Sequence, residues 1–402
     1  MVELRRVARP RLQIVASRGQ SLGQSANVGG SSITRVESRY RFRVGPECHD
    51  IQLVFANFTI GSGTGEADGP NPITVRAAIE TEQVVSDFTQ PAAAYPLLFD
   101  GAQARTIDPS ANAAMTDPLG IDFAAGTNAW VRTAAEITAG QFIPVGFSAS
   151  LSGTAERAFQ NSNATNQIYT TGELVAGTNG TQVSFAYGPA AILGIPRYPY
   201  PAVAIWGDSI TQGQGDLSGG DGAGNRGYAT RGLALANIPW VNLSRASDTP
   251  AQNRDAVSWR KRAPLQYATD VLVALGINQI GPTAPAVQIA YLRDVWDSCK
   301  RRGLRVHQCL VSCQTSGTFA DAAGQTINAQ FAANRATVNA AIIDAAAIGL
   351  IDGYLDPGSA WEDPANPGKF LPNATTDGTH PASTFHVAAA TIVQAYANLR
   401  IV

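Results

Sequence analysis

Cysteine, blocks of like charge and long apolar stretches are all scarce in this sequence. Four cysteines in 402 residues are too few for a disulfide-built fold, although Cys309 and Cys313 could pair with each other or with Cys299. The net charge is −2 and no run of five like charges occurs, so we expect no nucleic-acid partner. No apolar run reaches 18 residues, and the arginine-rich start lacks a signal-peptide core, so we expect neither a membrane partner nor a signal peptide.

The rest of the composition is that of a compact, turn-rich protein. Apolar residues make up 45% of the chain and charged residues 15%, with 39 glycines and 23 prolines, which allows a sizeable core. A chain of 402 residues exceeds what one hydrophobic core usually serves, so we expect two domains. The most basic stretch, residues 254–262 with Arg260, Lys261 and Arg262, is interpreted as a solvated face.

Residues 1–195 have the pattern of an all-β domain. Short alternating runs at residues 51–55, 73–77 and 130–133 are separated by clusters of Gly, Asn, Asp and Pro, and helical periods are scarce. This pattern predicts an antiparallel sandwich of jelly-roll type. Residues 194–201 (GIPRYPYP) hold three prolines, which resist both helix and central strand, and are interpreted as a linker.

Strand and helix patterns alternate over residues 196–402, the second predicted domain. Buried strands are expected at residues 203–206, 271–275 and 304–311, and helices at residues 228–236, 286–302, 328–347 and 383–399. This alternation predicts a parallel sheet with helices on both faces. Reactive side chains gather beyond the carboxyl ends of the strands in such a sheet, so motifs that directly follow strands are the strongest candidates.

The segment Gly207-Asp208-Ser209 directly follows the strand predicted at residues 203–206, which places Ser209 at the carboxyl end of that strand. A serine hydroxyl is a weak nucleophile that needs a base within hydrogen-bonding reach and a third group to orient the base. His380 stands three residues after Asp377 in the segment DGTHP, and at this spacing a tight turn lets the carboxylate accept the Nδ1 proton and leaves Nε2 as general base. We therefore predict Ser209 as nucleophile, His380 as base and Asp377 as its partner; the alternative is a serine that only caps a helix.

Acyl transfer also requires donors directed at the developing oxyanion. The backbone N–H of Ser209 is one candidate. The side-chain amide of Asn278 is another, because Asn278 follows the strand predicted at residues 271–275 and faces the same edge of the sheet.

Together these blocks resemble the SGNH (GDSL-type) hydrolases. GDSI at residues 207–210, GIN at 276–278 and DGTHP at 377–381 stand in the order of the family's blocks, and the resemblance covers roughly residues 200–402. It implies a flavodoxin-like three-layer α/β/α domain and metal-independent, cofactor-free hydrolysis of acyl esters through an acyl-serine. It assigns Ser209 as nucleophile and oxyanion donor, His380 as base, Asp377 as its orienter and Asn278 as oxyanion donor.

Two positions depart from the family's pattern. Ser247 stands where the second block usually has a glycine whose N–H completes the oxyanion hole, and its own N–H can serve if Ser247 adopts the required dihedral angles. We therefore include Ser247 among the predicted oxyanion donors. Gln279 replaces the aspartate that usually follows the asparagine, which leaves open how Asn278 is held.

Other motifs compete with this assignment. Residues 19–23 (GQSLG) match a nucleophile elbow, but no helical pattern follows, so we interpret them as a flexible loop. Residues 222–227 (GAGNRG) fit a dinucleotide fingerprint without the strand that should precede it, and a glycine-rich loop at the rim of the site is preferred. His49, His307 and His386 are interpreted as structural, and no compact cluster of metal ligands is found.

The sequence thus predicts a serine esterase that cleaves short-chain acyl esters of a small molecule or a carbohydrate. An O-acetylated carbohydrate is suggested only by analogy with jelly-roll modules that accompany such hydrolases. The alternative is a non-catalytic carbohydrate-binding or structural surface component with a degenerate hydrolase domain, which Ser247 and Gln279 favour.

Overall fold

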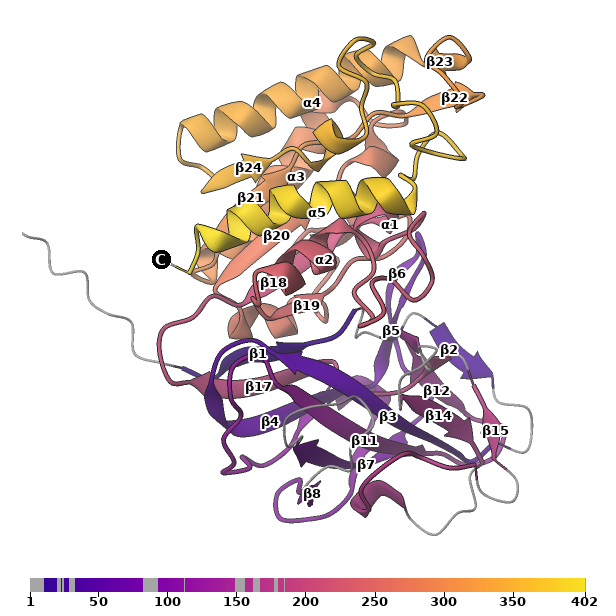
Figure 1. Ribbon diagram of the computed structural model, residues 1–402, viewed down its shortest axis with the longest axis vertical. Coiled ribbons are helices and arrows are strands. Elements are labelled where there is room, and N and C mark those ends of the chain that lie inside the picture. The colour runs from indigo at the N-terminus through magenta and orange to yellow at the C-terminus, as the bar shows by residue number, and fades with distance from the viewer. Residues whose placement is uncertain are drawn as a thin grey trace, which may run out of the picture.

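A computed structural model describes residues 11–401 except 20–22, 24, 29–32, 82–92, 112, 149–155, 162–166, 177–179 and 184. It has two parts, a β-rich part formed by the first half of the chain and an α/β part formed by the second (Figure 1). The centre of the GQSLG motif, residues 20–22, lies outside the described residues. No helix in the described ranges has both the length and the apolar character needed to cross a membrane.

The β-rich part is built on a large antiparallel sheet in the order β10-β4-β17-β1-β3-β11-β7-β8, with β14, β15 and β9 beside this path. Its strands are β1 Gln13–Ser17, β3 Arg35–Val44, β4 Cys48–Ala56, β7 Ile73–Thr81, β8 Ala93–Leu97, β9 Arg105–Ile107, β10 Ala113–Met115, β11 Asn128–Glu136, β14 Arg157–Gln160, β15 Thr181–Gln182 and β17 Ala191–Pro196. The β-rich part also contains three separate two-stranded sheets. They pair β2 Ser25–Val28 with β12 Phe142–Val145, β5 Phe58–Gly61 with β6 Gly65–Asp68, and β13 Phe147–Ser148 with β16 Phe185–Ala186. Two short 3-10 helices, η1 Pro109–Ala111 and η2 Gln167–Tyr169, connect strands.

The alternating runs predicted in this half lie in β4, β7 and β11, so these strand predictions are confirmed. The linker prediction was wrong at its start. Gly194 and Pro196 belong to β17, where they pair with Gln13 and Cys48. The register of β17 against β4 shifts between Leu193 and Ile195, and prolines within sheets are tolerated near such bulges.

The α/β part is a five-stranded parallel sheet in the order β19-β18-β20-β21-β24. Its strands are β18 Val203–Gly207, β19 Trp240–Asn242, β20 Asp270–Ala274, β21 Arg305–Cys309 and β24 Gly353–Leu355. Its helices are α1 Ser209–Gln212, α2 Tyr228–Leu235, α3 Pro285–Arg301, α4 Ala329–Ala347 and α5 Ser383–Asn398, with 3-10 helices η3 Ala251–Asn253, η4 Ala263–Tyr267, η5 Ile277–Gln279 and η6 Pro357–Ala360. A small hairpin, β22 Thr315–Gly317 with β23 Gln325–Ile327, precedes α4.

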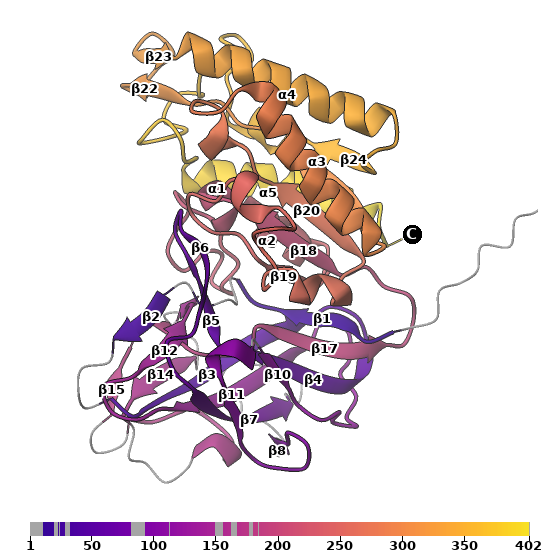
Figure 2. The ribbon, with the colours of Figure 1, turned by 180° about the vertical axis from the view of Figure 1, so that it is seen from behind.

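Helices cover both faces of this sheet. α2 packs against α5 on one face, and α3 packs against α4 on the other; α5 lies in front of the sheet in Figure 1 and α3 in front of it in Figure 2. The strands are buried on both faces, which is why β18 is apolar throughout rather than alternating. The predicted parallel sheet, its three strands and its four helices are confirmed to within a few residues.

One hydrophobic cluster joins the two parts. Ile14 of β1, Phe58 and Ile60 of β5, and Leu193 of β17 are buried in the same cluster as the strand residues of the α/β part. Polar contacts reinforce this junction, since Ser17 Oγ donates to Trp240 O over 2.9 Å. The β-rich part is therefore packed firmly against the α/β part.

The basic stretch at residues 254–262 is not the solvated face that we expected. Lys261 is 1% exposed and Arg262 4% exposed. Lys261 pairs with Asp248, Arg262 with Asp255, and Arg260 with Asp68 of β6. A buried cation is tolerated only with such partners. Asp248 and Asp255 lie near the stretch in the chain, whereas Asp68 comes from the β-rich part.

Candidate active site

Ser209 lies on a tight turn between β18 and α1. Asp208 caps α1, because its Oδ1 accepts the backbone N–H of Ile210 over 3.0 Å. A Cβ atom at Gly207 would lie 2.5 Å from Thr211 Oγ1, so the turn closes only with glycine there. As the first residue of α1, Ser209 has a backbone N–H with no acceptor inside the helix. The turn therefore presents both the hydroxyl and the N–H of Ser209 beyond the carboxyl end of β18.

His380 and Asp377 meet Ser209 in a continuous row. The Nε2 atom of His380 lies 2.8 Å from Ser209 Oγ, and its Nδ1 atom lies 2.6 Å from Asp377 Oδ2. The other carboxylate oxygen, Asp377 Oδ1, accepts the backbone N–H groups of Thr379 and His380, each over 2.9 Å. The structure thus brings together all three residues that the sequence singled out for nucleophilic chemistry.

The turn that carries His380 is held by the loop after β21. Gly378 has a φ of +76°, and a Cβ atom there would lie 1.9 Å from Thr315 O, so this position requires glycine. Thr315 N donates to Gly378 O over 2.9 Å, and Gln314 Nε2 donates to Thr379 Oγ1 over 2.9 Å. These bonds fix the direction in which the imidazole points.

The charge state of Asp377 follows from its contacts. Partial burial raises the pKa of this carboxyl, but hydrogen bonds from the His380 side chain and from the backbone of His380 and Thr379 outweigh it and lower the pKa to about 2. Asp377 is therefore a carboxylate at neutral pH. An ionised carboxylate at this place accepts a hydrogen bond from Nδ1–H of His380 and so favours the tautomer protonated at Nδ1. Nε2 is then left without a proton and faces Ser209.

Ser247 lies in the loop that follows β19. Its φ of +63° is in the left-handed region, which side chains other than glycine seldom adopt. The loop is tied to the nucleophile turn, because Arg245 N donates to Gly207 O and Ala246 N donates to Gln212 Oε1. Ser247 thus takes the kind of conformation expected of the glycine that it replaces.

Asn278 lies in η5, directly after β20. Its Nδ2 donates to Asp248 O over 3.0 Å, so a backbone carbonyl of the Ser247 loop holds the amide. The second N–H of this amide is not used by that bond. Gln279 does not hold Asn278 and instead accepts the backbone N–H of Ala251 over 3.3 Å. The backbone carbonyl of Asp248 therefore holds Asn278 in place of the residue after it, and nothing in the sequence indicated this role for Asp248.

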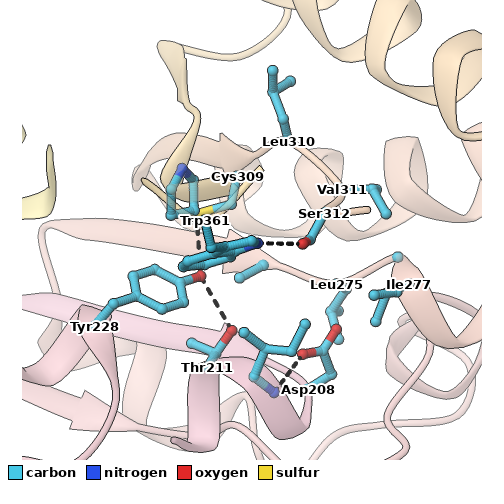
Figure 3. Close-up of a pocket in the computed structure, with 14 residues that line it drawn as sticks. Asp208, Thr211, Tyr228, Leu275, Ile277, Cys309, Leu310, Val311, Ser312 and Trp361 are labelled. Carbon is cyan, nitrogen blue, oxygen red and sulfur yellow. Dashed lines mark hydrogen bonds between the residues drawn. The ribbon is translucent and has the colours of Figure 1, made fainter. Parts of the chain in front are cut away.

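A small cavity of about 30 Å³ lies beside the nucleophile turn (Figure 3). Asp208, Tyr228, Cys309 and Trp361 border it, and Tyr228 OH donates to Cys309 Sγ over 3.7 Å. Ser209 is not among the residues that line this cavity, although its neighbours Asp208 and Ile210 are. Burial, together with the nearby charge of Asp248, raises the pKa of Asp208 to about 7.

Asp216 is a further organising residue that sequence reasoning missed. Its carboxylate accepts two bonds from Arg231, one from Gly227 N and one from Ser383 Oγ. These contacts tie the glycine-rich loop to α2 and to the start of α5, beside the turn that carries His380. The only available signal was an acidic and a basic residue flanking that loop in the sequence.

The remaining histidines lie outside this row. His386 is fully buried between Tyr228 N and Gln214 O, and burial lowers its pKa to about 4. His307 is buried against Tyr396, whereas His49 is half-exposed beside Asp50. All four cysteines lie within the described ranges and are buried free thiols (Cys48, Cys299, Cys309 and Cys313), so the pairings considered from the sequence are not formed.

Residues 205–388 match the model of the GDSL-like lipase/acylhydrolase family. Residues 205–388 therefore form a GDSL-like lipase/acylhydrolase domain. The matched GDSL-like segment starts inside β18, just before Ser209, and ends in α5, just after His380. No curated protein matches the chain in sequence.

Solved structures with detectable likeness include a GDSL-like lipase and carbohydrate esterases of family 2. A GDSL-like lipase from Bacteroides thetaiotaomicron is 14% identical over 50% of this chain and 88% of its own, with a TM-score of 0.35. A family two carbohydrate esterase from Clostridium thermocellum, in complex with cellohexaose, is 11% identical over 93% of this chain and 97% of its own, with a TM-score of 0.36. A carbohydrate esterase family 2 enzyme with a carbohydrate-binding domain, from Corynascus thermopiles (Myceliophthora fergusii), is 13% identical over 97% and 99%, with a TM-score of 0.37.

Proposed function

We propose that this protein is a serine esterase with Ser209 as nucleophile, His380 as general base and Asp377 as the carboxylate that orients the base. The observation that carries the proposal is the unbroken row of two hydrogen bonds from Ser209 Oγ through the imidazole to Asp377 Oδ2. Hydrolysis of an ester agrees with the GDSL-like lipase/acylhydrolase domain.

The first half of the reaction forms an acyl-enzyme. Ser209 Oγ attacks the ester carbonyl carbon while His380 Nε2 takes the hydroxyl proton, and the Asp377 carboxylate stabilises the imidazolium that results. The tetrahedral intermediate collapses when the C–O bond to the alcohol breaks and His380 returns its proton to the leaving oxygen. Water then attacks the acyl-serine by the same route, which releases the acid and restores Ser209.

Three donors are proposed for the oxyanion: the backbone N–H groups of Ser209 and Ser247 and the free N–H of the Asn278 amide. Each follows one of three neighbouring strands, β18, β19 or β20, at the same edge of the sheet. Donors held in place before the reaction stabilise developing charge without the cost of reorganisation. No step of this mechanism draws on a metal or a cofactor.

We propose short-chain acyl esters of small molecules or carbohydrates as the substrates, including O-acetylated carbohydrates, for which the only argument is analogy between modules. We also propose that the chain divides into two domains between residues 195 and 196, and that the first domain is a jelly-roll-like sandwich. A flavodoxin-like second domain belongs to the same proposal, since the order β19-β18-β20-β21-β24 reads 2-1-3-4-5 along the chain.

The test is hydrolysis of p-nitrophenyl acetate by the purified full-length chain, together with covalent labelling by a fluorophosphonate. We expect turnover and one label per chain at Ser209, and both should disappear in Ser209→Ala. Ser218→Ala, which changes an exposed serine in the loop after α1, is the matched control and should keep both. A chain that hydrolyses no ester in a panel extended to acetylated polysaccharides, and takes no label, would instead be the non-catalytic binding protein.

A further inference from the structure

The β5–β6 hairpin of the β-rich part reaches the loop that carries Ser247. Its base is anchored by Phe58 and Ile60, which are buried in the cluster shared by the two parts. From there the hairpin extends toward the loops beside α1, as both views show (Figures 1 and 2). A segment nearly 200 residues away in the chain thus lies against the proposed oxyanion hole.

The tip of the hairpin holds the loop on both sides of Ser247. On one side, Ser62 Oγ donates to Ala246 O over 3.1 Å, and Gly63 N donates to the same oxygen over 3.3 Å. Ser62 Oγ also lies 3.4 Å from Ser247 Oγ. On the other side, Gln252 Nε2 donates to Gly63 O over 2.6 Å. These contacts leave the loop little freedom to relax.

Glu66 of β6 fixes a second segment that supports the same loop. Its carboxylate accepts Ser258 Oγ over 2.6 Å and three successive backbone N–H groups, those of residues 259, 260 and 261, over 3.2, 2.9 and 2.8 Å. The Lys261 side chain then runs inward to a buried ion pair with Asp248, the residue after Ser247. Asp248 O is the acceptor that holds the Asn278 amide.

The conformation of Ser247 explains why such support is needed. A left-handed φ in a residue other than glycine carries a conformational cost and persists only when the surroundings determine it. The hairpin supplies contacts that select this conformation and, through Glu66, Lys261 and Asp248, the position of the Asn278 amide. The support of two oxyanion donors therefore depends on contacts with the β-rich part.

We propose that the β5–β6 hairpin is a positioning element of the oxyanion hole, with Ser62 and Glu66 as its positioning residues. On this view the β-rich part is a component of the catalytic unit and not a separable accessory module. The inference rests on the proposed esterase function. Because an oxyanion donor acts mainly on the transition state, displacing it lowers kcat and leaves KM nearly unchanged.

The test compares the full-length wild type with Glu66→Ala, Ser62→Ala and Ser62→Thr in hydrolysis of p-nitrophenyl acetate. We expect Glu66→Ala to lower kcat about tenfold to a hundredfold. Ser62→Ala removes one hydrogen bond and should lower kcat about threefold to tenfold. Ser62→Thr retains the hydroxyl and should restore wild-type kcat. KM should stay within about twofold throughout, and a boronic acid that forms a tetrahedral adduct with Ser209 should lose affinity in proportion to kcat.

Glu136→Ala is the matched control, because Glu136 also pairs with arginines in the β-rich part but lies on β11. It should leave kcat and boronate affinity unchanged. If the wild type turns over ester while Ser62→Ala and Glu66→Ala change only KM, only the unfolding temperature, or nothing, the hairpin has no positioning role and the esterase assignment stands. If Glu66→Ala does not fold, the comparison of Ser62→Ala with Ser62→Thr decides alone, because Ser62 is exposed. A wild type without turnover and without Ser209 labelling overturns both proposals.

Discussion

His380 Nε2 lies 2.8 Å from Ser209 Oγ, although 171 residues separate the two in the chain. The contact exists because Ser209 starts α1 just after β18, His380 lies in the turn before α5, and both lie at the same edge of the parallel sheet.

Replacing His380 with alanine should remove the base. We expect kcat for p-nitrophenyl acetate to fall by about 10²- to 10⁴-fold, the usual contribution of general acid–base catalysis. His49→Ala changes a half-exposed histidine on β4 and serves as control, with kcat expected within about twofold of wild type. Steady-state kinetics at saturating ester measure both. Comparable activity in the two variants would remove His380 from the mechanism.

Asn278→Asp should test the amide donor. The aspartate has nearly the same shape, but its ionised form has no N–H and places negative charge beside the oxyanion. We expect kcat to fall about a hundredfold to a thousandfold, with little change in KM. Asn366→Ala, in an exposed turn where the amide bonds Asp363, should leave kcat unchanged. A variant at 278 that alters KM alone would show that this residue binds the substrate and not the transition state.

Ser247→Gly should stabilise the protein. The positive φ of Ser247 costs a residue with a Cβ atom about 1 kcal/mol or more, and glycine avoids this cost. Part of the stabilisation is offset because glycine gives the unfolded chain more conformational entropy. We expect the free energy of unfolding to rise by about 0.5 kcal/mol. Denaturant titration measures it. Ser247→Ala keeps the Cβ atom and should bring no gain; equal effects of the two substitutions would rule out backbone strain as the cause.

Asp208→Asn should change how stability depends on pH. The pKa of Asp208 is raised to about 7 by burial and by the Asp248 charge, against an ordinary value of 3.8, so between about pH 4 and pH 7 the folded state holds a proton that the unfolded chain has released. Stability of the wild type therefore falls as pH rises through this window. Asparagine keeps the oxygen that caps α1 and has no charge to bury.

The check on Asp208→Asn is urea unfolding at several pH values from 4 to 8. We expect the variant to lose less stability than the wild type over this range and to be the more stable of the two at pH 8. Asp208→Ala, which lacks the capping oxygen, should be less stable than Asp208→Asn at every pH. Parallel stability curves for wild type and Asp208→Asn would mean that this carboxyl does not bind a proton on folding.

Local sequence signals were sufficient for the longer elements of the α/β part. An apolar run such as residues 203–206 predicts a buried strand because every side chain in it must avoid water. Helical periods placed α3, α4 and α5 within two residues of their observed bounds. β19 and β24 were missed because strands of three residues are too short to show a pattern.

The sequence by itself determined which residues could carry the chemistry, because Ser209, Asn278 and the pair Asp377 and His380 each stand in a short motif beside a predicted strand or helix. Only the tertiary structure decided how they are held. The contacts of Ser62 with the Ser247 loop and the reach of Glu66 to residues 258–261 join segments that are distant in the chain. A contact between such segments leaves no pattern in either one, since each reads as an ordinary polar loop until the packing of the two parts brings them together.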